Sequence, residues 1–217
     1  MRRWQTWLVV ALVSFGIVAV GPVEAREAGD RPRSYRERRY EGVVGQTDWS
    51  TCGPAALATY LTSFVGRATT EAEIIALTAE LRRERTGVSG TSMLQLKEAL
   101  EALGVLARGY RVDVDELAAY FERGGPPLIL HVTQPRLHYV VAVGLTKGTG
   151  GEYLALADPS YGRRLIPLPE IRDRFGFLGN VLAPLPAEPV LAHVKARQAE
   201  WIRQESRRLA QLEAARR

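Results

Sequence analysis

The chain has 217 residues, of which 46% are hydrophobic and 24% are charged, with a net charge of +5. This length can supply the core of one domain without covalent cross-links. Cys52 is the single cysteine, which excludes an internal disulfide and a metal site built from a cysteine cluster.

The N-terminal segment has the pattern of an export signal. Residues 1–3 are basic apart from Met1, and residues 8–20 are apolar. Val23-Glu24-Ala25 then places small residues at the positions that a signal peptidase recognises. The apolar run falls short of the roughly 20 residues of a spanning helix. We therefore expect a signal peptide over residues 1–25 that is cleaved on export to the periplasm. An uncleaved anchor that leaves the chain facing the periplasm is the alternative.

Both ends of the mature chain are basic. Residues 26–42 are arginine-rich and polar, and we predict a flexible lead-in there. Residues 186–217 follow a proline-rich linker and predict an amphipathic basic helix, with residues 43–185 as the folded domain between. Such ends suit contact with a membrane surface or a secretion-system partner, or are simply solvated. Aromatic residues do not interleave with the basic ones, so nucleic acid is not expected.

Helices dominate the first half of the domain. Apolar spacing predicts the first over residues 52–64, ended by Gly66. Each of the next three begins with a capping box, in which a short polar or acidic residue pairs with an acid or amide three residues later: Thr70 with Glu73, Ser92 with Gln95, and Asp113 with Glu116.

Strands dominate the second half. Short apolar runs bounded by turn residues predict strands over residues 105–112, 127–132, 137–145, 153–157, 163–166 and 177–183. Helices followed by strands indicate an α+β fold.

The stretch before the first of these helices carries the chemistry. Cys52 stands directly ahead of Gly53-Pro54-Ala55-Ala56, so it would lie at a helix N-terminus. The positive end of the helix dipole stabilises a thiolate there, which makes a nucleophile. Gln46 can add its side-chain amide to the Cys52 backbone N–H in binding an oxyanion. The alternative is a buried core thiol without chemistry.

A cysteine nucleophile needs a base and a group that orients the base. His138 begins an apolar strand, and Asp158 closes the next one. A hairpin turn centred near Gly148 would place the two residues directly opposite on one face, where a hydrogen bond can form. His131 fits a core residue better, His193 fits a solvated one, and Asp48 fits a loop-steadying role.

The combination resembles the papain-like peptidases that process bacteriocins and other peptides after double-glycine leaders. The matching residues are Gln46, Asp48, Cys52-Gly53, His138 and Asp158-Pro159, in the order of that family. The resemblance implies a papain-like fold, with a helical half that carries Cys52 packed on an antiparallel sheet. It also implies Cys52 as nucleophile, His138 as general base, Asp158 as orienter and Gln46 as oxyanion donor.

The chain also departs from the best-known members, which join a peptidase domain to membrane-spanning and ATP-binding parts. A glycine-rich phosphate loop is missing from the sequence, so neither ATP nor another cofactor is expected. We expect an exported cysteine endopeptidase that processes a secreted or surface protein, similar to members of functional-amyloid secretion systems. A non-catalytic module that binds a leader or partner, and a thiol acyltransferase or amidase, remain alternatives.

Overall fold

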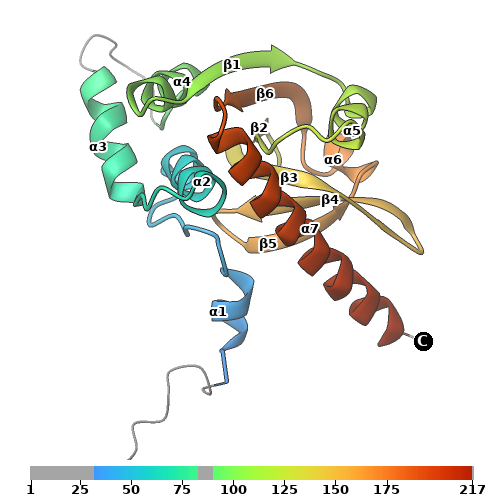
Figure 1. Cartoon of the computed structure of the whole chain (residues 1–217). Helices are drawn as coiled ribbons and strands as arrows, with labels where there is room; N and C mark the ends of the chain where they lie inside the picture. The colour runs from blue at the N-terminus through green and yellow to red at the C-terminus, as the bar shows by residue number, and fades with distance from the viewer. Residues whose placement is uncertain (1–31, 83–89, 217) are drawn as a thin grey trace, which may run out of the picture. The chain divides into compact units, whose positions relative to one another are not determined.

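The computed structural model describes residues 32–82 and 90–216, which form an α+β fold (Figure 1). Helices come first: α1 (Tyr35–Arg39), α2 (Cys52–Tyr60), α3 (Glu71–Arg82) and α4 (Met93–Ala102). The rest of the order is β1 (Leu106–Arg111), α5 (Val114–Glu122), β2 (Leu128–Val132), β3 (His138–Gly148), β4 (Gly151–Asp158), β5 (Gly162–Pro167), α6 (Glu170–Asp173), β6 (Phe177–Leu185) and α7 (Val190–Ala214). The predicted fold class is confirmed, and the signal-peptide prediction over residues 1–25 lies outside the described residues.

The six strands form one antiparallel sheet in the order β1-β6-β2-β3-β4-β5. Strand β3 lies inside this sheet, with β2 and β4 as its hydrogen-bonded neighbours. His138 is the first residue of β3 and Asp158 is the last residue of β4. Because neighbouring antiparallel strands run in opposite directions, the start of β3 and the end of β4 meet at the same edge of the sheet.

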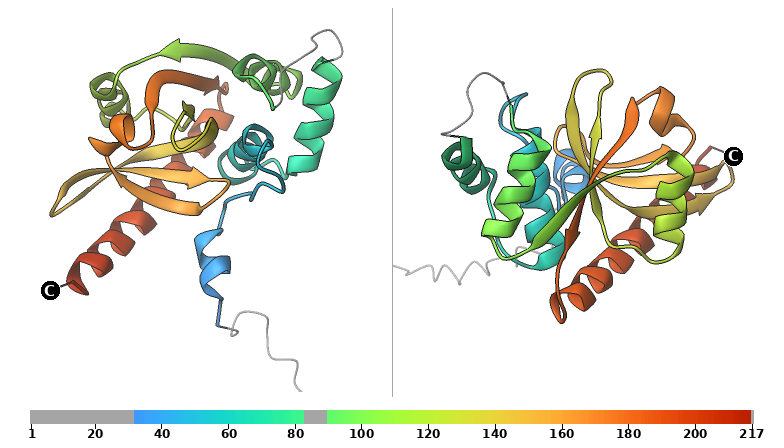
Figure 2. Two further views of the ribbon diagram at one scale, coloured as in Figure 1. Left: turned by 180° about the vertical axis from the view of Figure 1, so that it is seen from behind. Right: turned by 90° about the horizontal axis from the view of Figure 1, so that it is seen from above.

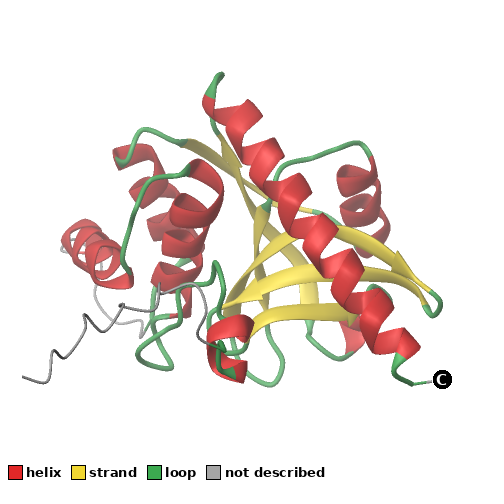
Figure 3. Cartoon of the chain, turned by 60° about the horizontal axis from the view of Figure 1, so that its bottom comes forward, coloured by secondary structure: helices red, strands yellow, loops and turns green. Residues whose placement is uncertain are grey.

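The two faces of the sheet support separate hydrophobic cores. Val141 and Val143 of β3 pack with α2 and with Val194 and Trp201 of α7 on one face. Alternate residues of the same strand, Val140 and Ala142, pack with α5 and α6 on the other face. Figures 2 and 3 show α7 crossing one face of the sheet, with α2, α3 and α4 grouped at its side. Strand alternation thus places helices on both faces.

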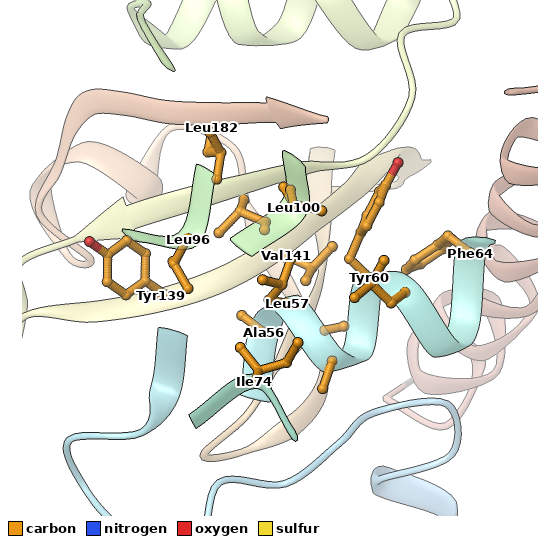
Figure 4. Packing of buried hydrophobic residues seen from close by; sticks show 14 of the residues in the cluster. Ala56, Leu57, Tyr60, Phe64, Ile74, Leu96, Leu100, Tyr139, Val141 and Leu182 are labelled. Atoms are coloured by element: carbon orange, nitrogen blue, oxygen red, sulfur yellow. The ribbon is translucent and has the colours of Figure 1, made fainter. Parts of the chain in front are cut away.

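Helix α2 is buried along its whole length, which explains why its sequence lacks a polar face. Leu57 and Tyr60 contact a core shared with Leu96 and Leu100 of α4 and with Val141 of β3 (Figure 4). The helix continues as a π-helical turn, Leu61–Val65, and ends at Gly66, whose φ of 81° is left-handed. Because the whole helix is embedded, its first residue, Cys52, is held firmly at the edge of the sheet.

The described part of the predicted lead-in, residues 32–42, differs from a flexible segment because it contains α1. Ser34 and Glu37 form a capping box at the helix start. Tyr40 then donates a hydrogen bond to the Ser160 carbonyl, 2.5 Å away, in the turn after β4. The capping pair and this contact order α1. Ser34 and Glu37 have the same capping-box spacing that predicted three later helices, whereas the Tyr40 contact depends on tertiary placement.

The predicted C-terminal helix is α7, and its apolar side packs on the chain's own sheet. Val194, Trp201 and Leu209 are buried there. Gln198 donates from Nε2 to the Val143 carbonyl at 2.6 Å and to the Gly125 carbonyl at 2.9 Å. Val143 lies at a bulge in β3, so α7 satisfies a carbonyl at the point where the β3–β4 register shifts. Within residues 32–82 and 90–216, none of the helices has both the length and the apolar character needed to cross a membrane.

Candidate active site

Cys52 is the first residue of α2 and is 6% exposed. The first amides of a helix have no acceptor within it, and Pro54 lacks an N–H. The loop before the helix is braced by Asp48, whose Oδ1 accepts from the Ser50 amide at 2.9 Å and from the Ser50 hydroxyl at 2.7 Å. These hydrogen bonds lower the pKa of Asp48. Asp48 therefore steadies the loop, which agrees with the role predicted for it.

His138 and Asp158 form the hydrogen bond that the sequence predicted. The His138 Nε2 lies 2.9 Å from the Asp158 Oδ1, and the two side chains are only 13% and 2% exposed. Burial alone would lower the pKa of His138, but hydrogen bonding to Asp158 and to Cys52, together with their negative charges, raises it to about 9. Burial would likewise raise the pKa of Asp158, yet hydrogen bonds from His138, Ser160 and Arg164 keep it below its usual value. The pair therefore favours imidazolium beside carboxylate.

The predicted register of the hairpin is wrong, although the contact is right. Val141 pairs with Ala157 and Gly148 pairs with Gly151, with a shift between Ala142 and Gly144. This register extends to place Asp158 opposite Val140, so His138 is its diagonal neighbour. A displacement of two residues keeps both side chains on one face. The turn begins later than Gly148, and the bulge then moves the pairing back by one residue towards the predicted register.

The Asp158 carboxylate has more partners than the sequence suggested. Its Oδ1 also accepts from the Ser160 amide at 2.8 Å and the Tyr161 amide at 3.2 Å, while Arg164 donates from Nη1 to Oδ2 at 3.1 Å. The Arg164 guanidinium lies 5.0 Å from the Tyr161 ring centroid and 4.9 Å from that of Phe175. Arg164 was missed by sequence reasoning. The signal for it was its place in the strand after Asp158, where a tight turn returns it to the same face.

Gln46 lies beside this turn, with both ends of its side-chain amide engaged. Its Oε1 accepts from the Ser160 hydroxyl at 2.8 Å and its Nε2 donates to the Asp48 carbonyl at 2.9 Å. Its backbone amide donates to the Pro159 carbonyl at 3.1 Å. A carboxamide nitrogen carries two hydrogens, so Nε2 retains a second donor. Gln46, His138 and Asp158 line one cavity of about 350 Å³, next to the segment that leads into Cys52.

The remaining histidines occupy the places that the sequence favoured. His131 is partly buried and its ring lies 4.8 Å from the Tyr139 ring, centroid to centroid. Burial and the charge of His138 lower the pKa of His131, which favours a neutral ring. His193 is exposed on α7. A cluster of three or more side chains suited to hold a metal ion is not found in the part of the chain that the structure describes.

Comparison with known proteins places this chain in a family. A model described as the Peptidase C39 family matches residues 41–187. The chain is 34% identical over 152 residues to a protein named probable functional amyloid protease FapD from Pseudomonas aeruginosa, covering 70% of this chain and 63% of that protein. A protein of the same name from Pseudomonas fluorescens is 29% identical over 185 residues, covering 84% of this chain and 73% of that protein.

One solved structure extends the likeness to the fold. The peptidase domain of Streptococcus ComA, a bi-functional ABC transporter involved in a quorum sensing pathway, aligns with a TM-score of 0.55 at 25% identity. The alignment covers 67% of this chain and 98% of that domain. The predicted papain-like arrangement, with helices that carry Cys52 followed by an antiparallel sheet, is thereby confirmed. Helix α7 and the described residues before position 41 lie outside the family match.

Proposed function

The chain belongs to the Peptidase C39 family, and we propose that it is an exported cysteine endopeptidase that processes a secreted or surface protein. The observation that carries this proposal is the 2.9 Å hydrogen bond between His138 and Asp158, at the sheet edge beside the start of α2. A base oriented by a buried carboxylate next to a cysteine is the arrangement that acyl transfer needs.

The proposed reaction begins with a Cys52 thiolate beside a His138 imidazolium. Asp158 is hydrogen-bonded to Nε2 of the ring, so Nδ1 is the nitrogen that remains to exchange a proton with the Cys52 thiol. The thiolate attacks the substrate carbonyl carbon, and the Cys52 amide and Gln46 Nε2 stabilise the oxyanion. His138 then protonates the leaving amine, and a water activated by the same ring releases the acyl group from Cys52.

The substrate class is inferred from relatives. Two similar proteins carry the name probable functional amyloid protease, and we propose that this chain acts on an exported component of a functional-amyloid system. The resemblance to double-glycine peptidases adds a cut after glycine-containing leader sites. Periplasmic location follows from the predicted signal peptide over residues 1–25.

A surface contact accompanies this proposal. Because the apolar side of α7 is used by the sheet, its exposed basic side chains, among them Lys195 and Arg207, remain for an anionic membrane or secretion partner. Sedimentation with vesicles that contain anionic lipid tests this, with Lys195→Gln and Arg207→Gln combined. Binding that is absent from the wild type, or unchanged in the variant, leaves these residues a solvating role only.

The function is tested by alkylation of Cys52 with iodoacetamide across pH, followed by mass spectrometry. A thiolate paired with His138 reacts well below the ordinary thiol pKa of about 8.5. His138→Ala is expected to move the profile to higher pH, whereas His193→Ala, which removes an exposed histidine, leaves it in place. A wild-type profile near the ordinary pKa that ignores His138 would contradict the pairing and favour a non-catalytic binding module.

Turnover is tested separately, with peptides that contain a Gly-Gly site and with their esters and primary amides. Cleavage of the internal peptide bond, lost in Cys52→Ala, supports an endopeptidase. Release of ammonia alone, or transfer to added amines without peptide cleavage, would instead identify an amidase or a thiol acyltransferase.

A further inference from the structure

The cavity beside the His138–Asp158 pair is not explained by the catalytic chemistry alone. It measures about 350 Å³, and its walls include residues 46–49, 134–136 and 158–161 together with His138, Arg164 and Phe175. Ligand pockets in proteins start at roughly 300 Å³, so this one suits a single large side chain better than a long segment. We call it the dyad cavity.

The walls of the dyad cavity are aromatic and partly open to solvent. Trp49 is 63% exposed and Tyr161 is 47% exposed, and Tyr40 and Phe175 also line the cavity. Trp49 belongs to neither hydrophobic core, so its exposure is not a by-product of packing. Large apolar side chains that stay exposed around a hollow mark recognition of an apolar group.

The charges in the dyad cavity are mostly neutralised by one another. Asp158 is 1% exposed and is held by His138, Arg164 and two backbone amides. Arg164 donates to that carboxylate. Asp48 accepts hydrogen bonds from Ser50, which is neutral, so Asp48 keeps its negative charge. Arg136, which is exposed, adds a positive charge to the same lining, so the charges of the walls balance to within one unit. A neutral side chain with a large apolar surface is therefore the occupant that these walls favour over a charged one.

The reaction indicates which half of a substrate reaches the cavity. When the Cys52 sulfur bonds to the carbonyl carbon, the C–N bond breaks, its electron pair stays on nitrogen, and His138 supplies the proton. The acyl half remains on Cys52, while the amine half lies against His138. The dyad cavity is lined by His138 and Gln46 but not by Cys52, so it lies on the amine side of the cut.

We propose that the dyad cavity is a specificity subsite for a large apolar, preferably aromatic, side chain on the amine side of the cleaved bond. This inference rests on the proposed peptidase function, since it assigns His138 as the proton donor. It adds a requirement on the residue that becomes the new N-terminus of the product, independent of any glycine on the acyl side.

Competition between amines and water for the acyl-enzyme isolates this subsite. The enzyme is given a small alkyl ester of a peptide that ends in Gly-Gly, together with glycinamide, leucinamide or phenylalaninamide. Mass spectrometry then measures the ratio of peptide bond formation to hydrolysis. Phenylalaninamide is expected to capture the acyl-enzyme on the order of 10-fold better than glycinamide, since apolar pockets discriminate by about that factor.

Two variants place the preference in the dyad cavity. Trp49→Ala and, independently, Tyr161→Ala are expected to bring the phenylalaninamide and glycinamide ratios together. Leu137→Ala is the matched control, because Leu137 is 67% exposed beside His138 but does not line the cavity, and it should retain the preference. Circular dichroism of each variant identifies a variant that has not folded, and the other aromatic variant then decides.

Three results would overturn the inference. Equal capture of all three amides by active wild type removes the subsite while leaving the peptidase standing. A Trp49→Ala change that alters preference for the acyl peptide instead assigns the cavity to the other half of the substrate. An enzyme that is never acylated at Cys52 removes the proposed function, and the subsite with it.

Discussion

Arg163 and Arg164 are neighbours on β5, yet they serve opposite faces of the sheet. Arg163 is 7% exposed, donates to Glu205 of α7 at 2.6 Å and lies 4.1 Å from the Trp201 ring centroid. Arg164 is 29% exposed, donates to Asp158 at 3.1 Å and lies between the rings of Tyr161 and Phe175. Each arginine therefore pairs with a buried carboxylate and stacks on aromatic side chains.

What separates the two clusters is the second partner of each carboxylate. Glu205 is shared with Arg208, a second arginine, at 3.4 Å. Asp158 is shared with His138, which titrates, and faces a cavity. An arginine–carboxylate pair thus holds α7 on one face of the sheet and orients the His138 base on the other. Substitutions in the two clusters should act on different observables.

The largest effect is expected from Glu205→Ala. The change leaves the Arg163 cation buried without its carboxylate, which costs about 3–5 kcal/mol of unfolding free energy. Urea denaturation followed by far-UV circular dichroism measures it. The double variant Arg163→Met with Glu205→Leu should recover most of that loss, because it removes both charges. A single variant as stable as the wild type would show that α7 is not fastened through this pair.

Asp158→Asn should act on catalysis instead. The amide preserves size but removes the charge that supports the His138 imidazolium, and triad data suggest a loss in kcat/KM on the order of 10²-fold or more. The alkaline limb of the pH–rate profile should also move below the His138 pKa of about 9, because a major cause of that raised value is gone. Initial rates on the Gly-Gly ester across pH measure both. Unchanged rates would deny Asp158 its orienting role.

Arg164→Met is predicted to have an intermediate effect, about a 10-fold loss in kcat/KM, or about 1.4 kcal/mol. Asp158 keeps His138 and two backbone amides, so it is loosened rather than released. Because Arg164 helps to lower the pKa of Asp158, the acid limb of the pH–rate profile should move to higher pH. Arg174→Met, which removes an exposed arginine paired with Glu170, should leave that limb in place. If the acid limb of the pH–rate profile of Arg164→Met did not move, Arg164 would have a structural role only.

A smaller effect concerns stability against pH. The folded-state pKa of His138 lies above its ordinary value of about 6.5. The protonated ring therefore contributes its full share to the free energy of unfolding below pH 6.5. This contribution declines as pH rises through about 9. Urea titrations at pH 6 and pH 9.5 should show a larger alkaline loss in wild type than in His138→Gln. Equal losses would indicate that the ring is not held as a cation in the folded protein.

The residues of the candidate site were predictable because local patterns mark them. Cys52 is followed by small residues that open a helix, and His138 and Asp158 stand at the ends of adjacent apolar strands. Their common edge follows from antiparallel connection alone. The face of the sheet on which a side chain lies depends only on whether a register shift is odd or even. The predicted contact between His138 and Asp158 is therefore correct although the predicted register is wrong.

The contacts that the sequence did not reveal depend on tertiary placement. The bulge between Ala142 and Gly144 is stabilised by Gln198, a residue more than 50 positions later. Arg164 became a partner of Asp158 only through the Asp158–Gly162 pairing of the next hairpin. Helix α1 begins with a local capping box, but its contact through Tyr40 reaches Ser160, 120 positions later. Partners that meet only through tertiary placement carry little signal in composition or periodicity.

The smallest effect is expected on the outward side of α7. Lys195 and Arg207 are exposed on the same helix that buries Glu205. Their replacement by glutamine should change the unfolding free energy by no more than about 0.5 kcal/mol, because exposed charges are solvated in both states. Urea denaturation of the double variant, with exposed Gln211→Ala as control, measures this. A loss comparable to that of Glu205→Ala would mean that the helix is held by its surface charges, and that the contrast between the two arginine clusters is misplaced.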